Sequence, residues 1–69
     1  MDIVKKLGQN LKEIRLSKGL SQGKIAKKLG VDPSYISQIE RGLGNMSLKK
    51  IERLAKALEV TIEQLIIQK

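Results

Sequence analysis

Residues that end helices alternate with residues that begin them along this chain, and this alternation constrains the fold more than any other feature. Four glycines follow segments with helical periodicity, where a helix C-terminus favours a left-handed residue; they are Gly19, Gly30, Gly42 and Gly44. Four residues with a side-chain oxygen precede such segments, where they can cap a free backbone N–H; they are Ser21, Asp32, Ser47 and Thr61. Pro33 directly follows Asp32 and suits the first position of a helix, which needs no N–H. The chain is therefore divided into short helices.

Each segment between these signals carries apolar residues spaced by three or four, which is typical of a helix with one buried face. The first segment, for example, has Ile3, Leu7, Leu11 and Ile14. No convincing alternation of period two indicates a strand. The sequence therefore predicts an all-α fold in which residues 1–69 form one compact domain. The five expected helices span residues 3–18, 22–29, 33–41, 48–58 and 62–67.

Composition argues against several functional classes. The chain has 69 residues and contains neither Cys nor His, so the usual zinc sites, disulfides and Cys or Ser–His nucleophiles cannot be built. A chain this short also has little room for a substrate pocket beside its core. We therefore expect no enzymatic activity, no cofactor and no metal.

Charge and hydropathy indicate the kind of partner. Fourteen Lys and Arg residues against seven Asp and Glu residues give a net charge of +7, which attracts polyanions. No apolar run approaches the ~20 residues that cross a bilayer, and no signal-peptide pattern opens the chain. We therefore expect a cytoplasmic protein with an anionic partner and no membrane association.

The second and third expected helices are joined by Gly30, Val31 and Asp32, which is the sequence form of a helix-turn-helix. On the third helix, Ile36 and Ile39 share the inward face. The opposite face holds hydrogen-bonding side chains, namely Ser34, Ser37, Gln38 and Arg41. Such a face fits the major groove of duplex DNA, where Gln can pair with adenine and Arg can bind guanine or a phosphate.

Alternatives remain open for this helix. Ser34, Ser37 and Gln38 could simply be solvated, although a solvating face would be expected to carry Lys and Glu in a chain with 30% charged residues. Tyr35, the single aromatic residue, lies on the flank of the helix. Its ring could fill the core, or its hydroxyl could reach a phosphate or a base edge. The positive charge lies mainly outside the uncharged face, which favours a reading helix with phosphate-binding surfaces on either side.

Several segments carry a combined pattern that covers nearly the whole chain. They are Ser21-Gln22-x-x-Ile25-Ala26, Tyr35-Ile36-Ser37-x-Ile39-Glu40-Arg41-Gly42 and Leu54-Ala55-x-Ala57-Leu58-x-Val60. This pattern resembles the Cro/repressor-type, or Xre-like, family of helix-turn-helix transcriptional regulators. Residues 32–37 with Asn45-x-Ser47-Leu48 are also similar to the controller proteins of restriction–modification systems. The resemblance implies a lambda-repressor-like domain of five helices that binds double-stranded DNA.

The resemblance and the helical-face argument together assign roles to individual positions. The expected base-reading residues are Pro33, Ser34, Tyr35, Ser37 and Gln38. The expected contacts to the DNA backbone are Gln22, Lys27, Arg41, Asn45 and Ser47. Arg15 and Glu40 match a partly buried ion pair of the family, which we expect to be structural. Gly23 lies early in the second helix, where it costs about 0.5–1 kcal/mol relative to Ala.

The expected mode of action is occupation of an operator that blocks or recruits RNA polymerase. One short reading helix buries little surface, so we expect a homodimer on a pseudo-palindromic operator. The last helix is the expected dimer surface, because its apolar residues are too many for one side of so short a helix; they are Ile62, Leu65, Ile66 and Ile67. Some of these residues could instead form a terminal core patch.

Two functions other than transcriptional regulation are alternatives for this chain. The chain could be an antitoxin that binds its own operator and has a toxin as its main partner, although only residues 61–69 are spare to wrap one. It could also be a cationic peptide that binds membrane surfaces. The regular helix caps and the separate apolar faces argue against the membrane peptide.

Overall fold

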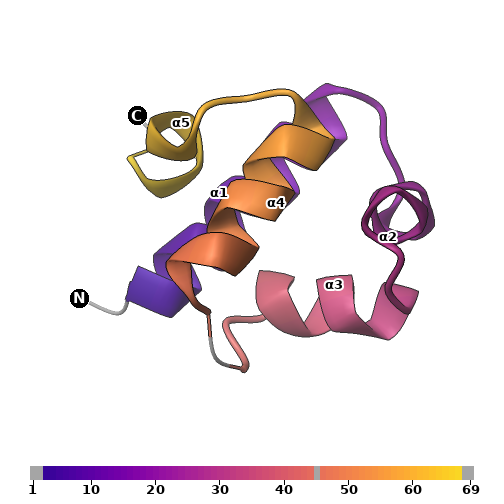
Figure 1. Ribbon diagram of the computed structural model, residues 1–69, viewed down its shortest axis with the longest axis horizontal. Helices are drawn as coiled ribbons and strands as arrows, with labels where there is room; N and C mark the ends of the chain where they lie inside the picture. The colour runs from indigo at the N-terminus through magenta and orange to yellow at the C-terminus, as the bar shows by residue number, and fades with distance from the viewer. Residues whose placement is uncertain (1–2, 45, 68–69) are drawn as a thin grey trace.

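The computed structural model describes residues 3–44 and 46–67, and these residues form five α-helices. The helices are α1 (Ile3–Ser17), α2 (Gln22–Leu29), α3 (Pro33–Glu40), α4 (Leu48–Leu58) and α5 (Ile62–Ile66). Figure 1 shows α4 in front of α1 along the same diagonal, with α2 and α3 forming a corner on the right and α5 lying on the left. The described part of the chain contains no strand, so the predicted all-α fold of five helices is confirmed.

Every helix begins at the expected residue, and the expected caps are in place at the start of α2, α3, α4 and α5. The Ser21 and Ser47 hydroxyls accept the backbone N–H groups of Lys24 and Lys50, at 3.0 and 3.2 Å. The Asp32 carboxylate accepts the Ser34 N–H at 2.9 Å. Thr61 forms a reciprocal capping box with Gln64. These local hydrogen bonds satisfy N–H groups that a helix start would otherwise leave free.

The helix ends differ slightly from expectation. Three helices, α1, α3 and α5, end one residue earlier than the apolar periodicity predicts. The chain leaves α2 through Gly30, whose φ is 73°. It leaves α4 through Glu59, which adopts the left-handed conformation at φ 59° without being glycine. A left-handed residue therefore ends α4 although the sequence carries no glycine signal there.

The core is built from aliphatic side chains of all five helices. Its members are Leu7, Leu11, Ile14, Ile25, Ala26, Ile36, Ile39, Leu54, Ala55, Leu58 and Leu65. The packing partners are α1 with α3 and α5, α2 with α3 and α4, and α4 with α5. Tyr35 is half-buried and packs against the edge of this core. The core thus holds α3 by Ile36 and Ile39 and leaves its other side free.

Asn10 and Gly8 are two of the residues that fix α1 against its neighbours. The buried Asn10 side chain donates to the backbone carbonyls of Leu65 and Ile66, at 2.8 and 3.3 Å. At Gly8, α1 approaches α3 so closely that an added Cβ would lie 2.2 Å from the Ile39 carbonyl oxygen. Asn10 therefore ties the short α5 to the rest of the fold, and Gly8 permits the close packing of α3.

Within the described residues, every helix is too short or too polar to cross a membrane.

Candidate nucleic-acid interface

The corner between α2 and α3 is held by backbone geometry at the turn. Gly30 takes the left-handed conformation, and the Val31 N–H donates to the Ala26 carbonyl at 3.0 Å. Asp32 then caps α3, and Pro33 occupies its first turn. Because α2 also packs directly on α3, the orientation of α3 relative to α2 is fixed (Figure 1).

The outward face of α3 begins with Pro33 and continues with hydrogen-bonding side chains. Pro33, Ser34 and Gln38 are exposed, and Ser37 is half-buried. Ile36 and Ile39 on the opposite face are almost completely buried. The predicted division of this helix into a buried face and a polar face is therefore present in the structure.

Asp32 places a carboxylate at the start of the outward face. The Ser34 backbone N–H, together with the Ser34 hydroxyl, lowers the pKa of Asp32 below its ordinary value. Hydrogen bonds to the charged form of a carboxylate favour that form. Asp32 therefore stays ionised near neutral pH and keeps capping α3, which orients Ser34.

Arg15 and Glu40, which the resemblance pairs, lie in contact between α1 and α3. Arg15 Nε lies 2.6 Å from Glu40 Oε2, and Arg15 Nη2 lies 3.2 Å from Glu40 Oε1. The two side chains are only 8% and 4% exposed. A third donor, Arg15 Nη1, reaches the Leu20 carbonyl at 2.7 Å. The guanidinium thus joins α3 to the loop before α2.

Gln22 joins the same network, which the sequence did not indicate. Its Nε2 donates to Glu40 Oε1 at 2.9 Å. The first side chain of α2 is therefore oriented by the last residue of α3. Gln22, which is expected to contact the DNA backbone, and the Arg15–Glu40 ion pair therefore form one hydrogen-bonded unit. Glu40 accepts hydrogen bonds from both Arg15 and Gln22.

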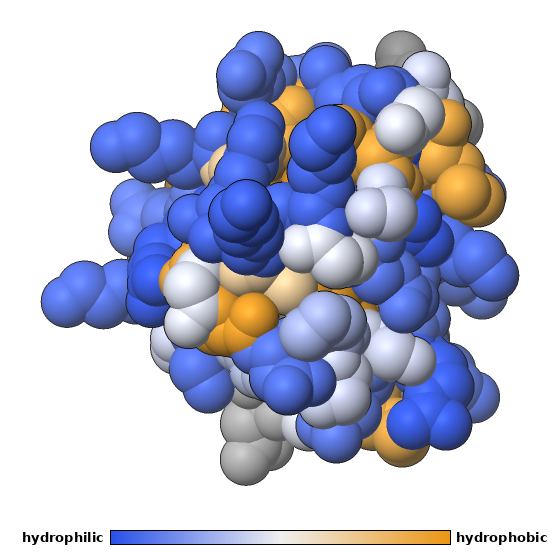
Figure 2. All heavy atoms as spheres, turned by 90° about the vertical axis from the view of Figure 1, so that its right-hand side faces the viewer, coloured by the Kyte–Doolittle hydropathy of each residue, from blue (hydrophilic) through white to orange (hydrophobic). Residues whose placement is uncertain are grey.

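The other residues expected to contact the DNA backbone lie around this unit. Lys27 and Arg41 are exposed, on α2 and just after α3. Ser47 is also exposed, but its hydroxyl caps α4 by accepting the Lys50 N–H. Asn45 lies outside the described residues. Figure 2, which views the molecule from the α2 side, shows that hydrophilic residues cover most of this face.

The residues expected at a dimer surface divide into two groups. Leu65 is 0% exposed and belongs to the core, so its assignment to an intermolecular surface is wrong. It faces inward because α5 packs on both α1 and α4, which cover that side of the helix. Ile62 and Ile66 are half-buried, and Ile67 is 68% exposed. Of the four expected residues, these three retain apolar surface that a partner could cover.

Two basic residues of α4 that were not assigned to the site also lie close to the corner. The Arg53 guanidinium donates to the Leu29 carbonyl at 2.9 Å, at the end of α2. Lys50 places its Nζ 6.0 Å from the centroid of the Tyr35 ring. Both residues are separated from the corner in sequence, and only the packing of α4 on α2 brings Arg53 there. The sequence shows that α4 is basic, which suits a phosphate-binding surface beside the reading helix, but no local signal predicts these two contacts.

Comparison with known proteins identifies the family of this arrangement. The helix-turn-helix family model HTH_3 matches residues 11–65. The control protein C.BamHI of Bacillus amyloliquefaciens is 47% identical over 60 residues, which cover 86% of this chain and 74% of that protein. The transcriptional regulator SinR of Bacillus subtilis is 39% identical over 64 residues, which cover 91% of this chain. The chain spans only 58% of the length of SinR.

A solved structure gives the same result. The crystal structure of the restriction–modification controller protein C.AhdI from Aeromonas hydrophila superimposes with a TM-score of 0.83 at 45% identity. The match covers 90% of this chain and 94% of that one. These findings confirm both the Xre-like resemblance and the similarity to controller proteins. The chain therefore belongs to the HTH_3 helix-turn-helix family, whose members include transcriptional regulators and restriction–modification controller proteins.

Proposed function

We propose that this protein is a transcriptional regulator that binds double-stranded DNA sequence-specifically, with α3 in the major groove. The observation that carries the proposal is the outward face of α3, which is polar and exposed while its opposite face is locked into the core. An α-helix of this kind fits the major groove, where each base pair presents a distinct pattern of donors and acceptors. Membership of a family of DNA-binding regulators supports the same function.

Base reading is assigned to the exposed residues at the start and middle of α3. Ser34 and Gln38 supply polar groups, and Gln38 is able to make a bidentate pair with adenine. Pro33 offers only apolar contact. Ser37 and Tyr35 are half-buried and would reach bases through their hydroxyl groups.

Contacts to the DNA backbone are assigned to residues on either side of α3. Gln22 stands at the start of α2, where the free N–H groups of a helix favour a phosphate. Its side chain is already oriented by Glu40, so Arg15 and Glu40 act as its support. Lys27, Arg41, Asn45 and Ser47 complete the proposed set.

A homodimer on a pseudo-palindromic operator is part of the proposal. The half-sites would lie about one helical turn, ~34–36 Å, apart. The proposed contact surface consists of Ile62, Ile66 and Ile67, which retain exposed apolar area on or just after α5.

The direct test is selection of binding sites from random duplex DNA, followed by titration of the selected duplex at two salt concentrations. We expect a recurring motif with two inverted half-sites, and an affinity that falls steeply with salt because phosphates are neutralised on binding. Recovery of unrelated sequences with equal affinity would contradict sequence-specific recognition.

A further inference from the structure

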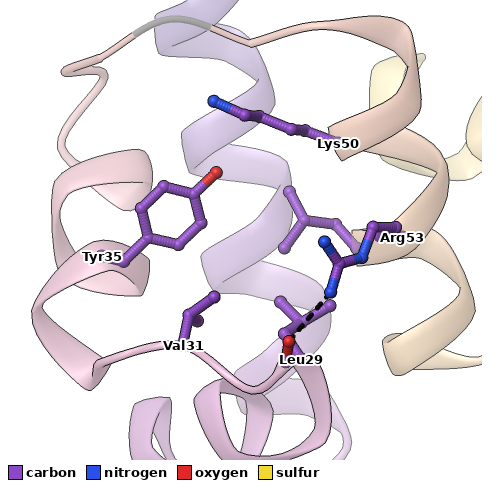
Figure 3. Close-up of a pocket in the computed structure, with 6 residues that line it drawn as sticks. Leu29, Val31, Tyr35, Lys50 and Arg53 are labelled. Carbon is purple, nitrogen blue, oxygen red and sulfur yellow. Dashed lines mark hydrogen bonds between the residues drawn. The ribbon is translucent and has the colours of Figure 1, made fainter.

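A cavity of about 250 Å³ lies between the helix-turn-helix corner and α4 (Figure 3). Its wall comes from the end of α2, the turn, α3 and α4. The lining residues are Leu29, Val31, Tyr35, Lys50, Arg53 and Leu54. The volume is slightly smaller than that of pockets for drug-sized ligands and suits a small metabolite.

Three hydrogen-bond donors from two helices converge on this cavity. Figure 3 shows the Tyr35 hydroxyl directed from α3 toward α4, from which the Lys50 and Arg53 side chains extend. Neither the Tyr35 hydroxyl nor the Lys50 ammonium makes a hydrogen bond with the described residues. Arg53 uses one of the five N–H groups of its guanidinium to donate to the Leu29 carbonyl, so the other N–H groups remain available. The cavity therefore offers the Tyr35 hydroxyl and the Lys50 ammonium without an internal acceptor, together with the remaining N–H groups of Arg53.

The rest of the wall is apolar, and no acidic side chain of the described residues lines it. Leu29 and Val31 are half-buried, and Leu54 belongs to the core. Covering this apolar surface with an apolar group removes it from water, which makes binding more favourable. A ligand that combines negative charge with a short apolar body therefore matches this wall.

We propose that this cavity is a binding site for a small amphipathic carboxylate. The carboxylate would accept hydrogen bonds from Lys50, Arg53 and the Tyr35 hydroxyl, and the apolar body would lie against Leu29, Val31 and Leu54. Charge-assisted hydrogen bonds of this kind are stronger than neutral ones and select for an anion.

Occupation of the cavity would lower the affinity for DNA, and this step rests on the proposed function. Tyr35 belongs both to the cavity and to the residues proposed to read DNA. A bound carboxylate would hold its hydroxyl toward α4 and add a negative charge beside the basic groups of α4. The two ligands would therefore oppose each other, and each would weaken the other by the same factor.

The first experiment measures binding without DNA, by titrating the chain with hexanoate and following the backbone amide signals in NMR spectra. We expect saturable shifts that centre on Leu29, Val31 and Arg53. Acetate tests the charge alone, hexanol tests the apolar body alone, and inorganic phosphate tests for a general anion site. Equal binding of acetate or phosphate, or the absence of saturable shifts with hexanoate, would overturn the proposal whether or not the chain binds DNA.

Variants then locate the site. Lys50→Gln should weaken hexanoate binding about tenfold, the size expected for a partly exposed charge-assisted contact. Lys49→Gln is the matched control, since Lys49 is an exposed neighbour that does not line the cavity. Similar weakening by both variants would show a diffuse charge effect and would contradict a specific site.

The coupling experiment measures affinity for the selected duplex with hexanoate or acetate at equal ionic strength. We expect hexanoate, and not acetate, to weaken DNA binding. Hexanoate binding without this difference would overturn the regulatory step while leaving the cavity as a ligand site. Failure to bind any duplex would instead count against the proposed function.

Discussion

Glu40 accepts hydrogen bonds from both Arg15 and Gln22, so one carboxylate joins α1, the start of α2 and the end of α3. Its side chain is only 4% exposed, which makes it a support for neighbouring groups rather than a surface contact. The side chain of the exposed Gln38, by contrast, makes no hydrogen bond within the described residues. Neighbouring residues of α3 therefore divide into those that hold the fold and those that are free to bind a partner.

Replacing Glu40 should test the supporting role. Glu40→Gln leaves the Arg15 guanidinium without its opposite charge in a mostly buried position, so we expect the free energy of unfolding to fall by about 3 kcal/mol. Urea unfolding followed by circular dichroism measures the change. The exposed Glu13 supplies the control, because Glu13→Gln should alter stability by no more than about 0.5 kcal/mol. Equal effects of the two variants would contradict the role of the buried pair.

Gln38→Ala should relax base preference without altering the salt dependence of DNA binding. A bidentate side chain contributes about 1–3 kcal/mol of discrimination at one base pair. Competition between the selected duplex and single-base variants measures this loss. Gln9→Ala, on the exposed surface of α1, is the matched control and should leave the preference intact. A uniform loss of affinity for all duplexes would argue against base reading by Gln38.

Asp32 should make the stability depend on acid pH. Its pKa is lowered in the folded chain by hydrogen bonds from Ser34, the backbone N–H first and then the hydroxyl. The stabilisation is therefore fully present above the unfolded pKa of Asp, near 3.8, and is lost as the pH falls through the lower folded value. Asp32→Asn keeps a cap acceptor but cannot titrate, so its stability should fall less between neutral and acid pH. Parallel unfolding profiles for the two proteins would contradict this assignment.

Two glycines in helices show that the packing between helices decides whether a glycine stabilises or destabilises the fold. Gly8 lies where α1 touches α3, and a Cβ there would meet the Ile39 and Glu40 carbonyl oxygens. Gly23 lies on the exposed side of α2, where a Cβ would find only the Ser21 hydroxyl oxygen, 3.8 Å away. The same residue type is thus required in one helix and unfavourable in the other.

Substitution by Ala should consequently have opposite effects at these positions. Gly23→Ala should raise the free energy of unfolding by about 0.5–1 kcal/mol, because Gly pays a larger entropic cost in a helix. Gly8→Ala should lower it by about 1–3 kcal/mol, because α1 must move away from α3. Thermal unfolding of the two variants measures both changes. A stabilising Gly8→Ala would contradict the close packing of α1 and α3.

For the molecule as a whole, the exposed apolar residues after α4 bear on assembly. Ile67 is 68% exposed and follows α5, whereas Leu65 is part of the core. A small domain buries only part of its apolar surface, so association with a second copy would cover residues that folding leaves exposed. Ile62, Ile66 and Ile67 are the positions proposed for this contact.

Ile67→Glu should convert the proposed dimer to monomer without unfolding the chain. A charge at an apolar interface costs desolvation free energy, whereas the side chain already faces solvent in a single copy. Sedimentation analysis gives the mass, and circular dichroism checks the helices. Ile3→Glu, at a 62% exposed residue of α1, serves as the control and should leave the mass unchanged. Unchanged mass for Ile67→Glu as well would place the dimer contact elsewhere.

The sequence by itself determined the five helices, their starting residues and the polar face of α3. These features depend on local causes, because caps such as Asp32 act within one turn and apolar spacing follows the helical period. Gly23 could likewise be judged from its position within α2. The family resemblance also implied the pairing of Arg15 with Glu40, which lie 25 residues apart in the chain.

Only the tertiary structure decided which residues share a partner. It joined Gln22 to Glu40, used Asn10 to hold α5, buried Leu65 and left Ile67 exposed. It also brought Lys50 and Arg53 of α4 around the cavity beside Tyr35. These outcomes depend on how helices distant in the chain pack, and a periodic pattern shows only that a helix has an apolar side. Which part of that side meets the core is set by the neighbouring helices.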